Sequence, residues 1–285
     1  MMKMGIVGAE NSHSWSMAAE MNVARKVPGF RVTHIWGETD EFARIAAERG
    51  KIPNIVKRPQ DMIGKVDCVM IDHRNGNHHV AAAKPFLKAR VPVFVDKPIT
   101  LSVAEGKRLL AYRKACRTVL TTMSSVPHQA CIRAFRKELA KLGDIQTVHL
   151  AGPGDANSPY GGIFFYGIHQ ADLMCELFGT DLRDATAIKQ EGRFNGIVRY
   201  RSGLTVTINM AAVNGFSIAA VGSKGGFYAP VVFDKQMGLP VARIITRMFR
   251  SGREPYNQAR MLAPIAILEA LDRSIRSGRT APVKQ

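Results

Sequence analysis

Residues 66–98 read VDCVMIDHRNGNHHVAAAKPFLKARVPVFVDKP, and this stretch decides the fold. Two short apolar runs, at 67–72 and 91–95, flank a segment at 78–89 with the composition of a helix. Strands that are apolar on both faces are typical of a parallel sheet that helices cover on both sides. The stretch therefore predicts a strand–helix–strand unit whose two strands run parallel.

The same alternation continues on both sides of this unit. Further elements of the series are expected as strands at 3–9, 30–37 and 118–124 and as helices at 11–27, 40–50 and 101–116. Repeated units of this kind with short loops form a doubly wound parallel sheet, and ligands bind at the carboxyl ends of its strands. We therefore predict an α/β Rossmann-type dinucleotide-binding domain over residues 1–122.

The pattern of predicted secondary structure changes after residue 144. Strand-like runs follow one another at 144–152, 183–190, 194–202, 204–212 and 216–231. RSG at 201–203 and SKGG at 223–226 have the composition of hairpin turns. With a helix near 166–179 and a final helix at 257–278, residues 123–285 are predicted to form an α+β domain with an open, mainly antiparallel sheet. The final helix is also able to pack back on the first domain.

Composition limits the class of protein. The chain of 285 residues carries a formal net charge of +17, but its Lys and Arg residues are spread over many predicted helices. Specific nucleic-acid binding is therefore a distant alternative, because a basic composition without a motif is weak evidence. No apolar run is long enough to span a bilayer, and the N-terminus reads directly as a strand. We expect a cytoplasmic protein.

Four cysteines, Cys68, Cys116, Cys131 and Cys175, lie apart in apolar contexts and form no CxxC pair. They are expected to be reduced, buried hydrophobic residues without a metal. Three histidines at 73, 78 and 79 beside Asp72 raise the question of a metal site. Neighbouring histidines at a helix start point in different directions, so no metal is predicted.

Three segments resemble the Gfo/Idh/MocA oxidoreductases. DKPIT at 96–100 is similar to the E-K-P segment of that family, and RNGNHH at 74–79 is similar to its P-N-x-x-H turn. GGIFFYGIHQAD at 161–172 resembles its G-G-x-x-x-D-x-G-x-H-x-x-D segment. The resemblance implies hydride transfer between NAD or NADP and a sugar, polyol or related cyclic alcohol. It also implies a homodimer or homotetramer that assembles through the C-terminal sheet.

The first loop departs from the family pattern G-x-G-x-x-G. It reads GAENSH, so Gly8 stands at the first glycine while Glu10 and His13 replace the other two. A carboxylate at the second glycine would repel a diphosphate unless it turned outward. Asn11, Ser12 and the start of the helix can still offer hydrogen-bond donors. Glu38 follows Gly37, the residue at the position of the usual acidic residue, and is able to reach a ribose hydroxyl, which favours NAD without excluding NADP.

Taken together, the resemblance and the sheet edge predict a set of cofactor-binding residues. The set consists of Gly8, Glu10, Asn11, Ser12, His13, Glu38, Asp72, His73, Asn75, His78, Asp96 and Lys97.

Oxidation of an alcohol needs a base for the hydroxyl proton, and a histidine has a suitable pKa. By resemblance, Lys97 matches the catalytic lysine, His169 and Asp172 match the helix motif, and Phe165 falls where the family has its aspartate. Tyr166 is left as either a proton donor or an aromatic wall of the pocket. The predicted catalytic residues are thus Lys97, His169, Tyr166 and Asp172. The predicted substrate contacts are Lys97, Ser124, Ser125, His128, Tyr166 and His169.

Two other functions remain open at this point. Because both the glycine loop and the aspartate are altered, the protein could be an inactive relative that binds a nucleotide or sugar as a sensor or partner subunit. The more distant alternative is a nucleic-acid binder that uses the basic surface. The leading interpretation depends on Lys97 and His169 meeting at one substrate.

Overall fold

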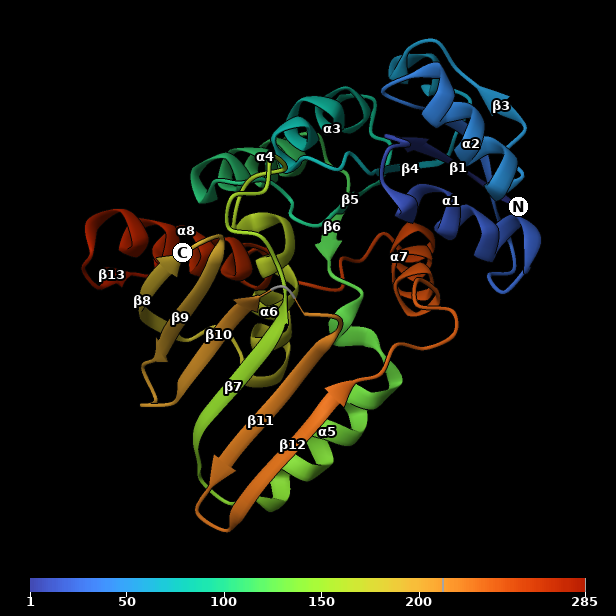
Figure 1. Ribbon diagram of the computed structural model, residues 1–285. Helices are drawn as coiled ribbons and strands as arrows, with labels where there is room; N and C mark the ends of the chain where they lie inside the picture. The colour runs from blue at the N-terminus through green and yellow to red at the C-terminus, as the bar shows by residue number, and fades with distance from the viewer. Residues whose placement is uncertain (212, 285) are drawn as a thin grey trace. The chain divides into compact units, whose positions relative to one another are not determined.

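The computed structural model describes residues 1–211 and 213–284, which form two compact units (Figure 1). Unit 1 contains residues 1–100, 104–123 and 236–261. Unit 2 contains residues 101–103, 124–235 and the chain from Leu262 onward. No helix in the described part of the chain combines the length and the apolar character needed to cross a membrane.

Unit 1 is built on a six-stranded parallel sheet, which confirms the predicted doubly wound fold. Its strands lie in the order β3-β2-β1-β4-β5-β6. Their bounds are β1 (Met2–Val7), β2 (Phe30–Trp36), β3 (Asn54–Ile55), β4 (Cys68–Ile71), β5 (Val93–Asp96) and β6 (Leu120–Met123). All residues of β4, β5 and β6 are buried, as their apolar sequences require. The order reverses at β1, so the carboxyl ends of β1 and β4 border the position at which such sheets bind ligands.

The helices of unit 1 alternate with these strands, as the sequence predicted. Their bounds are α1 (Ser12–Ala18), which continues into a π turn at Ala19–Val23, α2 (Asp40–Gly50), α3 (His79–Lys88) and α4 (Val103–Ala115). Asn11 caps α1 and Thr39 caps α2, each by a side-chain oxygen that accepts from a backbone amide. These caps fix where the loops after β1 and β2 turn into helices.

One helix of unit 1 comes from a part of the chain assigned by sequence to the second domain. Helix α7 (Leu239–Ser251) was not predicted, and residues 236–261 belong to unit 1 and not to the predicted domain 123–285. Its buried residues include Ile245 and Phe249, which join a core cluster with Met4 and Phe30. The apolar face of α7 therefore completes the core beneath β1 and β2, which is a tertiary contact that sequence distance conceals.

Unit 2 contains the predicted open sheet, with strands in the order β12-β11-β7-β10-β9-β8-β13. Their bounds are β7 (Ile145–Pro153), β8 (Leu182–Gln190), β9 (Arg193–Tyr200), β10 (Thr205–Ala211), β11 (Phe216–Gly222), β12 (Gly225–Val231) and β13 (Ala281–Pro282). β7 and β10 pair parallel and the other pairs are antiparallel. The hairpin turns after Tyr200 and Gly222 lie where they were predicted. The strand predicted at 204–212 ends with Ala212, which lies outside the described residues.

Unit 2 also contains three helices, which are α5 (Ala130–Lys141), α6 (Phe164–Phe178) and most of α8 (Gln258–Ser277). The part of α8 that belongs to unit 2 begins at Leu262. α6 packs against β7 and β10, and α5 packs against β12 (Figure 1). All residues of α6 from Gly167 to Cys175 are buried, including His169 and Asp172, whereas Tyr166 near the start of the helix is exposed. A helix buried all round must satisfy its polar side chains internally.

Candidate functional site

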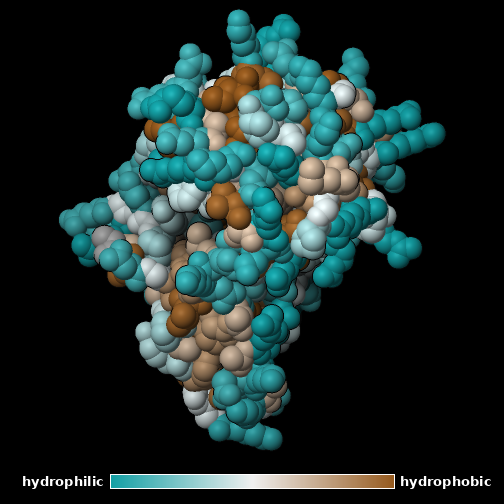
Figure 2. All heavy atoms as spheres, turned by 90° about the vertical axis from the view of Figure 1, so that its right-hand side faces the viewer, coloured by the Kyte–Doolittle hydropathy of each residue, from teal (hydrophilic) through white to brown (hydrophobic). Residues whose placement is uncertain are grey.

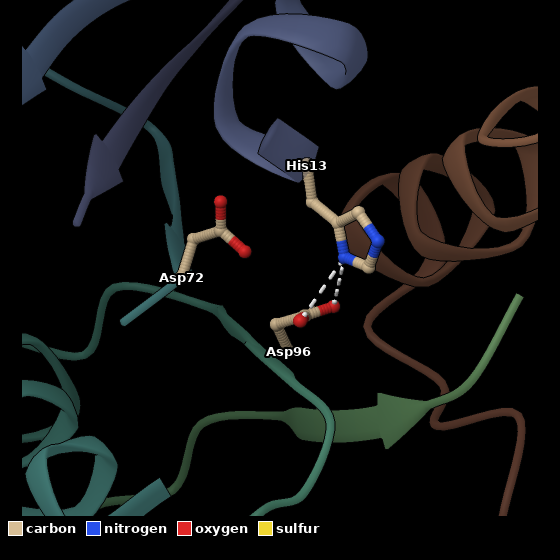
Figure 3. A group of neighbouring side chains, drawn as sticks. All are labelled: His13, Asp72 and Asp96. Carbon is tan, nitrogen blue, oxygen red and sulfur yellow. Dashed lines mark hydrogen bonds and ion pairs between the residues drawn. The ribbon is translucent and has the colours of Figure 1, made fainter. Parts of the chain in front are cut away.

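Polar side chains converge where β1, β4 and β5 of unit 1 end (Figure 3). His13 in the first turn of α1 lies with its Nδ1 3.1 Å from Oδ2 of Asp96, the last residue of β5. The Asn11 amide donates to Oδ1 of Asp72 over 3.1 Å and to Oδ2 of Asp96 over 3.2 Å. We call Asn11, His13, Asp72, Asp96 and Lys97 the edge cluster. Parallel strand ends bring together residues that are up to 86 positions apart in the chain, from Asn11 to Lys97 (97 − 11).

The two carboxyl groups of the edge cluster have opposite electrostatic settings. Asp72 is fully buried, and its Oδ2 has no hydrogen-bond partner. Burial raises the pKa of Asp72 well above its usual range, and the charge of Asp96 raises it further. Burial also opposes ionisation of Asp96, but His13 and Lys97 outweigh that effect and lower the pKa of Asp96. This environment therefore favours the protonated form of Asp72 and the ionised form of Asp96.

His13, Asp72 and Asp96 also form a group of metal-type ligands. One ligand atom from each lies within 4.8 Å of the others. However, the Asn11 amide already donates to both carboxyl groups, and the Lys97 ammonium lies 3.7 Å from Asp96. These two donors supply the positive charge and hydrogen bonds that a cation would otherwise provide. The absence of a metal stays a prediction.

The loop after β1 keeps part of the geometry of a dinucleotide site. Gly8 has φ +105°, and an added Cβ would stand 2.6 Å from the backbone nitrogen of His73, so only glycine fits. The Glu38 carboxylate accepts from the amides of Ala9 and Glu10 over 2.8 and 3.0 Å and contacts His73 Nδ1 at 2.9 Å. Burial would raise the pKa of Glu38, but these hydrogen bonds lower it to about 2. An ionised acid thus lies beside the loop, where an adenosine ribose would need an acceptor.

The two side chains that replace family glycines are both held by partners. The Glu10 carboxylate lies 3.7 Å from the Arg74 guanidinium, and His13 is held by Asp96. Arg74 therefore offsets the negative charge that Glu10 brings to the loop. The close turn at Gly8, the acid at Glu38 and the capped start of α1 fit a dinucleotide, with altered side chains around its diphosphate.

Lys97 is not a solvated loop lysine. It is only 8% exposed, and its ammonium lies 3.7 Å from Asp96 Oδ2. A buried ammonium beside a carboxylate is held in a defined place, which a catalytic or ligand-binding lysine requires.

His79 is a residue of this region that sequence reasoning missed. Its Nδ1 lies 2.7 Å from the carbonyl oxygen of Pro98, and its Nε2 lies 2.8 Å from that of His73. Burial lowers the pKa of His79 to about 4, against the opposing effect of these carbonyl groups. The imidazole lies between the loop after β4 and the loop that carries Lys97, and in its neutral form it donates to one of the two carbonyl oxygens. The sequence signal for His79 was the pair of histidines at the helix start. The resemblance to the family turn favoured the other member of that pair, His78.

The remaining predicted residues of unit 1 have local roles. Asn75 caps the short 3-10 turn at Gly76–His78 by accepting from the Asn77 amide. The His78 ring is exposed, and its centroid lies 5.5 Å from that of the His73 ring. Ser12 begins α1.

A second group of predicted residues meets within unit 2. The Ser124 hydroxyl lies 2.7 Å from His169 Nδ1, and the Ser124 amide donates to Asp172 Oδ2 over 2.7 Å. We call Ser124, His169 and Asp172 the Ser124 set. The Ser124 hydroxyl is thus the group that the structure places at Nδ1 of the imidazole. His169 is 6% exposed, so its ring is fixed by packing as well as by this contact.

Tyr166 lies one turn before His169 on α6. It is 38% exposed, and its ring centroid lies 5.8 Å from that of His169. Phe165 packs edge-on against the Tyr166 ring at 4.9 Å. Ser125 precedes the 3-10 turn at Val126–His128, and its carbonyl accepts from the Gln129 side chain.

Comparisons with known proteins support the fold. Residues 2–123 match the family model GFO_IDH_MocA, described as an oxidoreductase family with an NAD-binding Rossmann fold. A search of curated proteins found no match.

Solved structures share the fold of the whole chain. A probable dehydrogenase from Thermotoga maritima aligns with TM-score 0.84 and 17% identity over 99% of this chain and 98% of its own. A putative myo-inositol dehydrogenase from Sinorhizobium meliloti 1021 aligns with TM-score 0.80 and 18% identity over the full length of both chains. An Agrobacterium radiobacter oxidoreductase in complex with NAD+, L-tartaric acid and magnesium aligns with TM-score 0.81 and 15% identity over 99% of this chain and 98% of its own.

Proposed function

We propose that the protein is an oxidoreductase of the Gfo/Idh/MocA family, whose model matches residues 2–123, and that it transfers a hydride between NAD(P) and a sugar, polyol or related cyclic alcohol. The observation that carries the proposal is the edge cluster, because it puts a buried lysine and an ionised carboxylate at the carboxyl edge of the sheet. The substrate class draws support from the myo-inositol dehydrogenases of similar fold. Fold alone does not fix a substrate, so the class needs its own test.

Residues of the first loop and the strand ends would hold the cofactor. Glu38 would accept from the adenosine ribose, and this favours NAD, since a 2′-phosphate would meet its negative charge. The amides of Ala9 and Glu10 already donate to Glu38, which directs an incoming phosphate to the amides of Asn11 and Ser12. Arg74 would balance the remaining charge of the diphosphate. When bound, the nicotinamide supplies the hydride acceptor.

His169 is proposed to take the hydroxyl proton of the substrate. The contact of Nδ1 with the Ser124 hydroxyl holds the imidazole, and we propose Nε2, the other ring nitrogen, as the atom that takes the proton. Ser124 is a positioning residue, and Asp172 fixes Ser124 through its amide. Lys97 would stabilise the negative charge that develops on the substrate oxygen. Ser125 and His128 are proposed as further substrate contacts.

The open face of the unit 2 sheet is proposed to pair in a homodimer or homotetramer of a cytoplasmic protein. Burial alternates along β9 and β11, and exposed Ile197 and Val221 lie on the uncovered side. In the view of Figure 2, tan and brown side chains gather in the lower part of the molecule, with hydrophilic ones around them. Light scattering on a size-exclusion column tests this proposal, and a monomeric mass that persists at high protein concentration would refute it.

The test of function separates cofactor binding from turnover. Quenching of protein fluorescence by NADH and NADPH measures binding, and we expect NADH to bind more tightly. A panel of inositols and other polyols with NAD+, followed at the absorbance of NADH, measures turnover. The Lys97→Met variant should bind NADH yet lose most of the activity. Binding without turnover of any polyol or sugar would instead support a sensor, and absence of binding would reject the proposed function.

A further inference from the structure

A basic pocket lies at the edge of unit 1 opposite to the edge cluster. The cavity has a volume of about 540 Å3. Its walls come from the turn before β2 and from α7, and they include Lys26, Pro28, Arg243, Thr246, Arg247 and Arg250. Pro28 precedes the first residue of β2, whereas the edge cluster follows the last residues of the strands. A strand of seven residues spans roughly 20 Å, so the pocket is separate from the proposed cofactor site.

The charged side chains that line the pocket are all positive. Arg243, Arg247 and Arg250 lie at helical spacing on the exposed side of α7, whose sequence LPVARIITRMFRS contains no acidic residue. Lys26 adds a fourth cation from the turn, and its charge acts on Glu20, which does not line the pocket. In the part of the chain that the structure describes, no ion pair joins Lys26, Arg243 or Arg247 to a carboxylate. Four cations that repel one another favour an anion between them.

Arg250 is held in place before any ligand arrives. Its guanidinium lies 4.9 Å from the centroid of the Phe30 ring and donates to the carbonyl oxygen of Pro28. An added Cβ at Gly29, where φ is +81°, would stand 2.6 Å from Arg250 Nη2, so a side chain at residue 29 would displace the guanidinium from this position. A pre-organised arginine loses less conformational entropy when it binds an anion.

We propose that this pocket binds the di- or triphosphate group of a small molecule. Guanidinium groups bind phosphate oxygens in pairs of parallel hydrogen bonds, which suits a ligand with several phosphate oxygens. The volume falls in the range of small-molecule sites, and Val27 and Pro28 give the pocket an apolar floor. The proposal does not rest on the oxidoreductase function. It also gives a role to part of the net charge of +17, which the cofactor site does not use.

Isothermal titration of the full-length protein with sodium tripolyphosphate and with ATP tests the proposal. We expect saturable 1:1 binding that weakens at least tenfold in the double variant Arg243→Gln/Arg247→Gln. The matched control Lys84→Gln/Lys88→Gln removes two cations of α3 in the same unit and should change the affinity less than twofold. Equal affinities for the two ligands would assign recognition to the phosphates alone, and tighter binding of ATP would add the nucleoside.

Three outcomes would overturn the proposal. The first is no saturable binding of either ligand, and the second is an equal loss in both double variants, which would indicate diffuse charge. The third is a 20-base-pair DNA duplex that binds through Arg243 and Arg247 while the small polyphosphates do not, which would indicate nucleic acid. NADH affinity measured on the same variants should stay within twofold of that of the unsubstituted protein, because the two sites lie at opposite edges of the sheet.

Discussion

The edge cluster of unit 1 and the Ser124 set of unit 2 differ in how they hold buried polar groups. The edge cluster brings two carboxyl groups, an ammonium and an imidazole together, so the charge on each group depends on its neighbours. In the Ser124 set, one carboxylate accepts from a backbone amide and a hydroxyl contacts an imidazole. The edge cluster therefore controls the charge of its side chains, whereas the Ser124 set controls the orientation of the imidazole.

The largest expected effect concerns orientation and catalysis in the Ser124 set. His169→Asn should lower kcat by about 10³-fold, because a general base contributes about that factor. Ser124→Ala should lower kcat only about tenfold and move the pH profile, since the base remains but loses its partner at Nδ1. Steady-state kinetics between pH 6 and 9 measure both. An unchanged pH profile in Ser124→Ala would contradict the positioning role, and full activity of His169→Asn would remove the base from the mechanism.

The edge cluster predicts unequal effects of two isosteric changes. Asp96→Asn should lower the free energy of unfolding by about 4 kcal/mol, because it leaves Lys97 buried beside a neutral group. Asp72→Asn should lower it by less than about 1 kcal/mol, since burial and the charge of Asp96 already favour the neutral form of Asp72. Urea unfolding at pH 7 measures both values. Equal decreases in the free energy of unfolding would show that both carboxyl groups are ionised. The edge cluster would then not set different charges on its two carboxyl groups.

His79 predicts a pH dependence of stability. Its pKa is about 4 in the folded protein, below the ordinary value of 6.5 for a histidine, so the unfolded chain binds the proton first as the pH falls. Stability should therefore be complete above pH 6.5 and decline from there to pH 4, by at most about 3 kcal/mol. In His79→Gln this part of the decline should be absent. If urea unfolding curves of the two proteins show the same slope over that range, the buried neutral state of His79 is wrong.

Glu38 predicts a change in cofactor preference. Glu38→Gln should weaken NADH binding about tenfold, because a charge-assisted hydrogen bond to the ribose becomes a neutral one. The affinity for NADPH should fall less, since its 2′-phosphate no longer meets the negative charge of Glu38. Glu41→Gln, an exposed change in the first turn of α2, is the matched control. Equal weakening for both cofactors would show that Glu38 acts only on the loop amides of Ala9 and Glu10.

The smallest effect is expected at Tyr166. Its ring lies between Phe165 and the His169 ring, which suits an aromatic wall. Tyr166→Phe should therefore keep kcat within about threefold, and the Tyr166→Ala control should raise KM. If Tyr166→Phe instead slows turnover by about two orders of magnitude, the hydroxyl takes part in proton transfer. Tyr166 would then join His169 as a side chain that transfers a proton.

The sequence predicted the strands of both units well, because short apolar or alternating runs between turn residues are local signals. The hairpin turn at Ser223–Lys224 and the buried strand at Cys68–Ile71 are examples. Helix α7 was missed, and its place in unit 1 depends on contacts with Phe30 and Met4 far away in the chain. The predicted residues of the first loop do come together, but the pairing of Glu10 with Arg74 could not be derived from spacing.

The sequence by itself determined the order of strands and helices, the parallel sheet at the N-terminus and the residues that follow its strands. Those properties arise from hydrophobic periodicity and turn residues, which act over a few positions. The opposite pKa shifts of Asp72 and Asp96, the position of His79 between two loops and the burial of His169 all depend on the tertiary structure. Protonation and burial depend on neighbours that distant segments supply, so no local pattern encodes them.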